Sequence, residues 1–271
     1  LVDATTGSNL VDFTRASSAT YVGSDGLIKT AVTNEARFDH DPTTGESLGL
    51  LVEESRTNLL LRSEEFDTTW SASDASVSAN QTIAPDGNTT ADKLVCGTGT
   101  PIFQGIAQSV TATASATRFS VYVKAAELDQ VELRSFNPTD VAVFDLSTQQ
   151  VLSQSLTPDP TITDAGNGWY RCSITSASSG ATTFRISLVS GGSRTFTPIP
   201  GAGLYLWGAQ LEEGTFPTSY IPTTSSTVTR AADVASITGA NFSSWIDFND
   251  GTLFSDSTVI APDVQTQAAW S

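Results

Sequence analysis

Arg118-Phe-Ser-Val-Tyr-Val-Lys124 decides the fold, because apolar and polar side chains alternate along it. Phe119, Val121 and Val123 point to one side of an extended chain, and the residues between them point to the other. A period of two residues is typical of a half-buried β-strand. No segment of the chain sustains a helical period, so this stretch predicts a protein built from strands.

Similar stretches recur along the middle of the chain, at the roughly 8–12 residue spacing that is typical of a β-sandwich. Composition favours the same fold, because 39% of the residues are hydrophobic, only 15% are charged, and Thr and Ser are abundant. Hydroxyl side chains compete for the hydrogen bonds of a helical backbone, and they suit strands and turns better. We therefore predict an all-β, antiparallel domain over residues 58–222, with strands at 91–96, 102–110, 118–124, 131–136, 141–146, 150–153, 169–174, 183–188 and 203–212.

Residues 1–57 are predicted to form a small strand-rich unit with two turns. Gly23-Ser-Asp-Gly26 predicts a hairpin, because Asp-Gly supplies the positive φ that tight hairpin turns require. Asp41-Pro-Thr-Thr-Gly45 predicts a second turn, before a short strand at 48–52. The unit is too small to bury much surface by itself. We expect it to pair with another subunit or to wrap the following domain.

Residues 223–271 are predicted to be a linker and a partial C-terminal β segment. Residues 223–229 are poor in hydrophobic side chains, and apolar stretches return between 242 and 259. The sequence stops before another β domain could close, and it contains no Met. We expect a fragment, a processed product or the ordered part of a longer protein.

The charge and the cysteines exclude several classes of protein. There are 29 acidic and 13 basic residues, for a net charge of −16, whereas nucleic-acid binding needs clustered Lys and Arg. No apolar run approaches the roughly 20 residues of a membrane-spanning helix. We expect no nucleic-acid partner and no membrane insertion. Cys96 and Cys172 match no zinc-binding spacing. We expect free thiols, as in a protein that assembles in a reducing cytoplasm, with one disulfide as the alternative.

A longer signature covers Phe38-Asp-His-Asp-Pro-Thr-Thr-Gly-Glu-Ser-Leu-Gly-Leu-Leu-Val-Glu-Glu-Ser-Arg-Thr-Asn-Leu-Leu-Leu61. Together with Phe13-Thr-Arg-Ala-Ser-Ser-Ala-Thr-Tyr21, it resembles a segment of bacteriophage head-spike and tail-fibre proteins, across residues 9–66. The resemblance implies a location on the virion, at the capsid or the tail surface. It also implies a homotrimer that contacts other virion proteins. Trimer formation would cover the unpaired strand edges of the first unit.

The middle of the chain resembles a second family, the jelly-roll carbohydrate-binding modules. The matching stretches are Asn58 to Trp70, Asn167-Gly-Trp-Tyr-Arg171 and Leu204 to Pro222. The resemblance implies a jelly-roll sandwich that binds host cell-surface polysaccharide. Residues 229–234 and 242–259 are similar to the start of a concanavalin A-like or laminin-G-like domain.

Five residues are candidates for sugar binding, because sugar rings stack on aromatic side chains and their hydroxyls bind amides and guanidinium groups. We expect the strand with Tyr122 to neighbour the strand with Arg134 in one sheet. The alternative is that the aromatic side chains belong to the core, which we expect for Trp169 and Trp207. The candidates are Tyr122, Arg134, Phe136, Asn137 and Gln210.

Three acidic residues are candidates for structural calcium, which binds six to eight oxygen ligands. Glu64, Glu65 and Glu212 fall at the first and last strands of the jelly roll, where the second resemblance implies such a site. The alternative is that all three are solvated acids.

No residue pattern indicates catalysis. The many carboxylates single out no acid pair for glycan hydrolysis. A Ser-His-Asp site would have to use His40, the sole histidine, which lies beside a turn. We predict a non-enzymatic virion fibre, spike or decoration protein. The alternatives are an accessory sugar-binding module of a secreted polysaccharide-degrading enzyme and a phage depolymerase.

Overall fold

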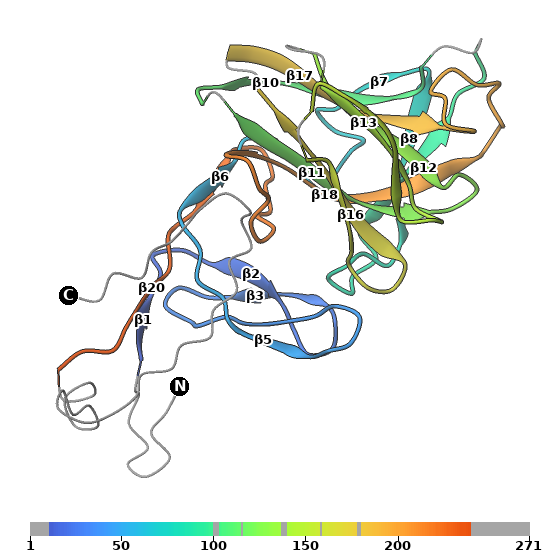
Figure 1. Ribbon diagram of the computed structural model, residues 1–271. Helices are drawn as coiled ribbons and strands as arrows, with labels where there is room; N and C mark the ends of the chain where they lie inside the picture. The colour runs from blue at the N-terminus through green and yellow to red at the C-terminus, as the bar shows by residue number, and fades with distance from the viewer. Residues whose placement is uncertain are drawn as a thin grey trace. The chain divides into compact units, whose positions relative to one another are not determined.

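The structure is a computed structural model, and it describes residues 11–99, 103–114, 116–136, 140–157, 159–177 and 180–239. Over these ranges the chain consists of strands and connecting loops (Figure 1). No helix long and apolar enough to cross a membrane occurs among them. The predicted all-β class is confirmed.

Two six-stranded antiparallel sheets pack against each other as a β-sandwich. We name each sheet after one of its central strands. The β12 sheet has the order β14 (Gln150–Ser155), β13 (Val141–Asp145), β12 (Gln130–Ser135), β17 (Gly180–Val189), β10 (Gly105–Ala112) and β7 (Ser71–Ser73). The β11 sheet has the order β15 (Thr161–Asp164), β16 (Trp169–Ser176), β11 (Thr117–Ala125), β18 (Gly203–Glu213), β9 (Ala91–Cys96) and β8 (Ala75–Thr82).

The strand pairing has the nested order of a jelly roll. Antiparallel pairs form between β9 and β18, between β10 and β17, between β11 and β16, and between β12 and β13. Successive pairs in this series belong to alternate sheets, so a ladder of paired strands is rolled into two layers. The predicted antiparallel jelly-roll sandwich is confirmed.

The main core lies between the two sheets. Phe119, Val121 and Val123 of β11 are all fully buried in it. Phe119 packs against Phe184 of β17, with 5.3 Å between the ring centroids. The alternation along β11 therefore arises from one face of the strand packing on the opposite sheet. The expectation of a half-buried strand is wrong, however, because β11 is buried on its other face as well.

A second apolar cluster, the aromatic cluster, explains the burial of that other face. It contains Tyr122 of β11, Trp207 of β18, Trp169 and Tyr220. Trp207 and Tyr220 lie 4.6 Å apart between ring centroids, and Tyr122 meets Trp207 edge to face at 5.5 Å. The expectation that Trp169 and Trp207 are core residues is confirmed, since each is only 1% exposed.

Contacts divide the chain into two compact units, Thr14–Val234 and a second unit of residues 1–13 and 235–271. In the second unit the structure describes only residues 11–13 and 235–239. The domain boundaries after residues 57 and 222 stay predictions. The short two-stranded sheets pair β1 (Asp12–Thr14) with β20 (Val234–Ser236), β2 (Ala19–Val22) with β3 (Ile28–Ala31), β4 (Phe38–His40) with β5 (Ser47–Leu50), and β6 (Arg56–Asn58) with β19 (Val228–Arg230).

Both predicted turns of the first segment are present. Gly26 has a φ of 74° in the turn between β2 and β3, and Gly45 has a φ of 71° between β4 and β5. A Cβ on Gly26 would lie 2.5 Å from the backbone oxygen of Pro42, so no other residue fits there. His40 lies at the second turn, where its Nδ1 is 3.1 Å from the carbonyl oxygen of Val22.

A buried charge cluster ties the first segment to the chain that follows the sandwich. Asp233 accepts hydrogen bonds from Arg15, at 3.0 Å, and from Arg37. Glu53 accepts from Arg37, at 2.8 Å, and from Arg230. Burial by itself raises the pKa of Glu53, but the charges of Arg230 and Arg37 outweigh it and hold that pKa below its ordinary value. Residues 14–57 are thus held by the chain that follows the sandwich, and the two predicted arrangements of the first unit stay predictions.

Both cysteines are free and buried. Cys96 and Cys172 belong to the main core. Burial raises the pKa of both thiols, so neither side chain is a reactive thiolate at neutral pH.

Candidate glycan-binding face

The outer face of the β11 sheet is covered by the chain after β18. Gln210 accepts a hydrogen bond from the backbone N–H of Ile221 at 2.6 Å, and Glu212 accepts from the N–H of Thr218 at 2.9 Å. Arg171 donates to the carbonyl of Thr218 at 2.7 Å. These bonds occupy the polar groups that this face would otherwise offer to a ligand.

The outer face of the β12 sheet is partly open, over β7, β10 and β17, and the strand register brings outward side chains into rows there. Arg134 of β12 lies opposite Arg185 of β17, and Arg185 lies opposite Ala107 of β10. Ala107 in turn lies opposite Ser71 of β7. The residues next to them along the strands point inward; Ile186, for example, is fully buried in the main core.

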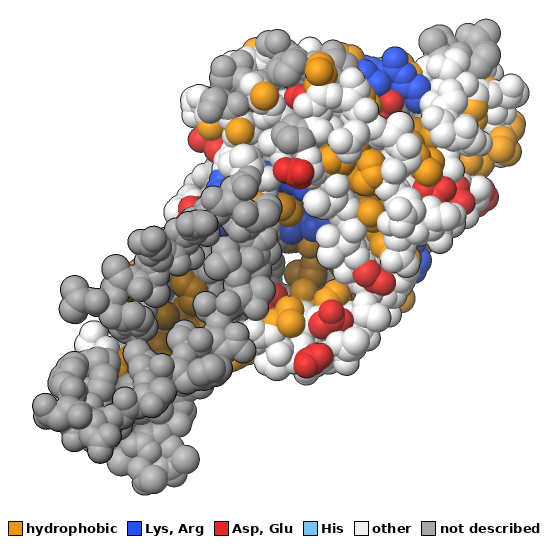
Figure 2. Space-filling model, viewed as in Figure 1, with side chains coloured by type: hydrophobic (Ala, Val, Ile, Leu, Met, Phe, Trp, Pro, Cys, Tyr) orange, Lys and Arg blue, Asp and Glu red, His pale blue; other side chains and the backbone are white. Residues whose placement is uncertain are grey.

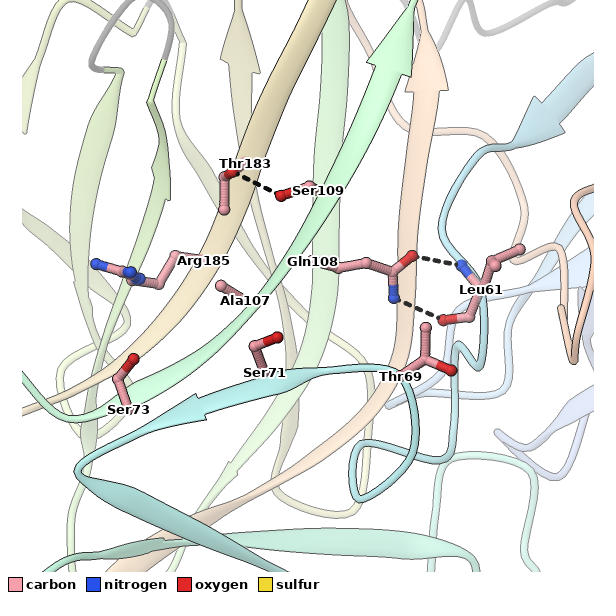
Figure 3. Close-up of a pocket in the computed structure, with 9 residues that line it drawn as sticks. All are labelled: Leu61, Thr69, Ser71, Ser73, Ala107, Gln108, Ser109, Thr183 and Arg185. Atoms are coloured by element: carbon pink, nitrogen blue, oxygen red, sulfur yellow. Dashed lines mark hydrogen bonds between the residues drawn. The ribbon is translucent and has the colours of Figure 1, made fainter.

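Small side chains leave a depression of about 430 Å³ on this open face (Figure 3). The volume falls within the range of typical small-ligand sites. Ser109 and Thr183 are joined by a 2.9 Å hydrogen bond, and the Gln108 amide holds the backbone of Leu61 through bonds of 2.8 and 2.9 Å. The depression is lined by Leu61, Thr69, Ser71, Ser73, Ala107, Gln108, Ser109, Thr183 and Arg185.

Aromatic rings and guanidinium groups are stacked at the Arg185 end of the depression. The guanidinium carbon of Arg185 is 3.7 Å from the ring centroid of Phe103 and 4.6 Å from that of Phe136. Arg134 lies 5.8 Å from the same Phe136 ring. Phe136 is 40% exposed, so part of its ring is available to a ligand. We call Phe103, Arg134, Phe136 and Arg185 the stacked group.

The charge beside the stacked group is positive. Glu132 holds Arg134 through two hydrogen bonds, of 2.9 and 3.0 Å, and lies 3.8 Å from Arg194. Burial, together with the charges of Arg134 and Arg194, lowers the pKa of Arg185, while Glu132 opposes the shift. Three arginines therefore share one carboxylate. Figure 2 shows that basic side chains are few on the face it presents, with one patch near the top and others near the middle of the view.

The structure does not bring the five predicted sugar-binding residues together. Arg134 and Phe136 lie on the open face, whereas Tyr122 and Gln210 lie on the covered face of the other sheet. Asn137 lies outside the described residues. The expectation that the strands of Tyr122 and Arg134 are neighbours is wrong, because β11 and β12 belong to different sheets. Alternation of apolar and polar residues identifies a strand, but it does not show to which of the two sheets the strand belongs.

Sequence reasoning missed Arg185 and Phe103. A signal for Arg185 exists, because it stands between Phe184 and Ile186 as an outward residue between two inward ones. Arg134 is likewise an outward residue, next to the inward Leu133. What the sequence lacks is the register that places these two arginines opposite each other.

The three predicted calcium ligands each have a partner within the protein. Glu64 accepts from the Tyr220 hydroxyl at 2.9 Å, Glu65 pairs with Arg62, and Glu212 binds Thr218. Burial, aided by the charge of Asp86, raises the pKa of Glu64. Within the described ranges, no three His, Cys, Asp or Glu side chains are grouped so as to hold a metal ion. Calcium stays a prediction.

Comparison with solved structures finds chains that are weakly similar to this one. No family model matches the chain, and no curated protein matches it. The CBM22-1–GH10 modules of Clostridium thermocellum endo-1,4-beta-D-xylanase 10B, solved with xylohexaose, align at 12% identity over 57% of this chain and 28% of that one, with a TM-score of 0.35. The enzymatically active domain of tailspike protein 4 of bacteriophage CBA120 aligns at 11% identity over 59% and 21%, with a TM-score of 0.33. Less than a third of either solved chain is matched.

Proposed function

We propose that this protein binds a glycan on the open face of the β12 sheet. The observation that carries the proposal is the depression of about 430 Å³ that ends at the stacked group. The hydroxyl groups that line the depression can form hydrogen bonds with the hydroxyl groups of a sugar. The exposed part of Phe136 can stack on the apolar face of a sugar ring. An open face also suits a long polymer better than an enclosed cavity would.

The residues of this face suit binding of a glycan better than its cleavage. Glycan hydrolysis requires two carboxylates beside the scissile bond. The described residues that line the depression include no Asp or Glu. Glu132, the nearby acid, is already held by Arg134.

The proposal extends to a homotrimeric virion surface protein that binds host polysaccharide and contacts other virion proteins. The support for the virion is the likeness of residues 9–66 to phage fibre proteins. The support for self-association is a set of exposed apolar side chains on the first segment, because such patches mark interaction surfaces. These are Val32, Phe38, Leu48 and Val52. An accessory module of a secreted enzyme would use the same sheet face.

A glycan array tests the binding site. Ser109→Trp would fill the depression from an exposed position on β10, and we expect it to abolish binding of every glycan that the wild type retains. Thr111→Trp is the matched control, because Thr111 is also exposed on β10 but does not line the depression. Equal binding by Ser109→Trp and the wild type would overturn the assigned face. An array without any bound glycan would overturn the proposed function.

A further inference from the structure

We infer that the glycan bound on the open face is acidic, and that Arg185 binds its carboxylate. The inference rests on the proposed function and names the class of sugar. It concerns bacterial polysaccharides that contain uronic or sialic acids. Neutral glycans would leave the positive charge of this site without a partner.

Arg185 differs from every other basic side chain of the protein. All 13 Lys and Arg residues fall within the described ranges. Twelve of them make an ion pair or a hydrogen bond there; the buried Arg118, for example, donates to Ser173 and Thr175. Arg185 makes neither within these ranges, and its Nε is buried without a partner. A guanidinium that lines an open depression without a hydrogen bond is available to a ligand.

The geometry around Arg185 favours a carboxylate. The guanidinium carbon of Arg185 lies 3.7 and 4.6 Å from the ring centroids of Phe103 and Phe136, and an arginine that contacts ring faces keeps the terminal N–H groups in its own plane for a ligand. A guanidinium edge matches a carboxylate through two parallel hydrogen bonds. Stacking also restricts the side chain before a ligand arrives, which lowers the entropy cost of binding.

Charge supports the same class of ligand. The protein carries a net charge of −16, and most of its surface therefore repels an anionic polymer. Arg134, Arg185 and Arg194 gather around Glu132 alone, so this region is locally positive. An acidic glycan would be attracted to the open face and repelled elsewhere. Binding should therefore weaken as salt is added.

The test uses the full chain and matched pairs of glycans. An array carries alginate, polygalacturonate and sialylated oligosaccharides beside neutral xylan, glucan and mannan. Each acidic glycan that binds is compared by calorimetry with its carboxyl-reduced form, which keeps the polymer but removes the charge. We expect reduction to weaken binding about tenfold or more, the effect of losing a charge-assisted hydrogen bond.

Variants then assign the effect to Arg185. Arg185→Gln should weaken binding of the acidic glycan about tenfold or more. Arg185→Lys should retain part of the affinity, because lysine keeps the positive charge but cannot form the two parallel hydrogen bonds of a guanidinium group. Lys124→Gln is the control; it removes the same charge from β11, in the other sheet. Thermal unfolding checks that each variant folds. If Arg185→Gln does not fold, the affinity of Arg185→Lys is the test.

Four results would overturn the inference. Binding of neutral glycans alone, or equal binding of acidic glycans and their reduced forms, would refute the acidic class while leaving the proposed function intact. Unchanged affinity in a folded Arg185 variant would refute the role of Arg185. If no glycan binds at all, the proposed function fails together with this inference.

Discussion

Arginine side chains in this protein differ in role because their neighbours differ. Arg37 is fully buried between two carboxylates. Arg118 is also buried, but hydroxyl groups surround it, and burial together with the charge of Arg171 lowers its pKa to about 10. Arg185 contacts two aromatic rings at the edge of an open depression. The first two arginines hold the fold together, and we propose that the third binds the ligand.

Asp233→Asn tests the buried charge cluster. Asp233 accepts from Arg15, from Arg37 and from the backbone N–H of Glu53. Removing its charge leaves buried arginines without full compensation, and we expect the free energy of unfolding to fall by about 3–5 kcal/mol. Urea denaturation measures the change.

Glu65→Gln is the control for this experiment. It removes one acid of the exposed Arg62–Glu65 pair and should leave the unfolding midpoint unchanged. If Asp233→Asn were equally harmless, the cluster would not be what secures residues 14–57.

Individual strands could be predicted from the sequence, but their arrangement could not. The strand predicted at 91–96 has the bounds of β9, and the strand predicted at 118–124 falls within β11. Such local patterns come from side chains that alternate between two faces. Pairing between β10 and β17 joins residues that are far apart in the sequence, such as Gly105 with Ser187 and Ala112 with Gly180, and alternation does not encode such a partner. Arg134 and Phe136 were therefore found, whereas their neighbour Arg185 was not.

The turn between β13 and β14 gives a prediction at the scale of one element. Asp145 accepts hydrogen bonds from the Ser147 hydroxyl and from the backbone N–H groups of Ser147 and Thr148. The Ser147 hydroxyl contributes most, and together these bonds lower the pKa of Asp145 to about 2. A lowered pKa stabilises the fold above the unfolded value of 3.8, and this stability is lost as pH falls towards 2.

Asp145→Asn should therefore be less stable than the wild type at pH 6, and the difference should vanish as pH approaches 2. Urea unfolding between these pH values measures it. Ser147→Ala should reduce the same pH dependence, because it removes the largest contribution. A difference between Asp145→Asn and the wild type that does not change with pH would contradict this account of the turn.

At the scale of the whole molecule, the two outer faces of the sandwich differ in how far the chain covers them. The outer face of the β11 sheet is occupied by the chain itself, through Gln210, Glu212 and the aromatic cluster. The outer face of the β12 sheet keeps an open depression. One face thus joins parts of the protein, and the other is the face to which we assign glycan binding.

The proposed homotrimer predicts a particle mass in solution. Light scattering after size exclusion should give three times the 28.4 kDa of the chain. The double variant Leu48→Lys, Val52→Lys should lower the mass to that of one chain, because both side chains are exposed on the first segment. Leu152→Lys, at an exposed position on β14, is the control and should leave the mass unchanged. A wild type of single-chain mass would contradict the trimer.

A crystal structure of the protein with a glycan selected on the array tests the central claim most directly. We predict a sugar over the depression on the β12 sheet, in contact with Ser73, Ala107 and Arg185. A second depression, of about 240 Å³, is lined by Glu64, Trp207 and Tyr220 among others. A sugar bound there, or anywhere else away from the β12 sheet, would contradict the account.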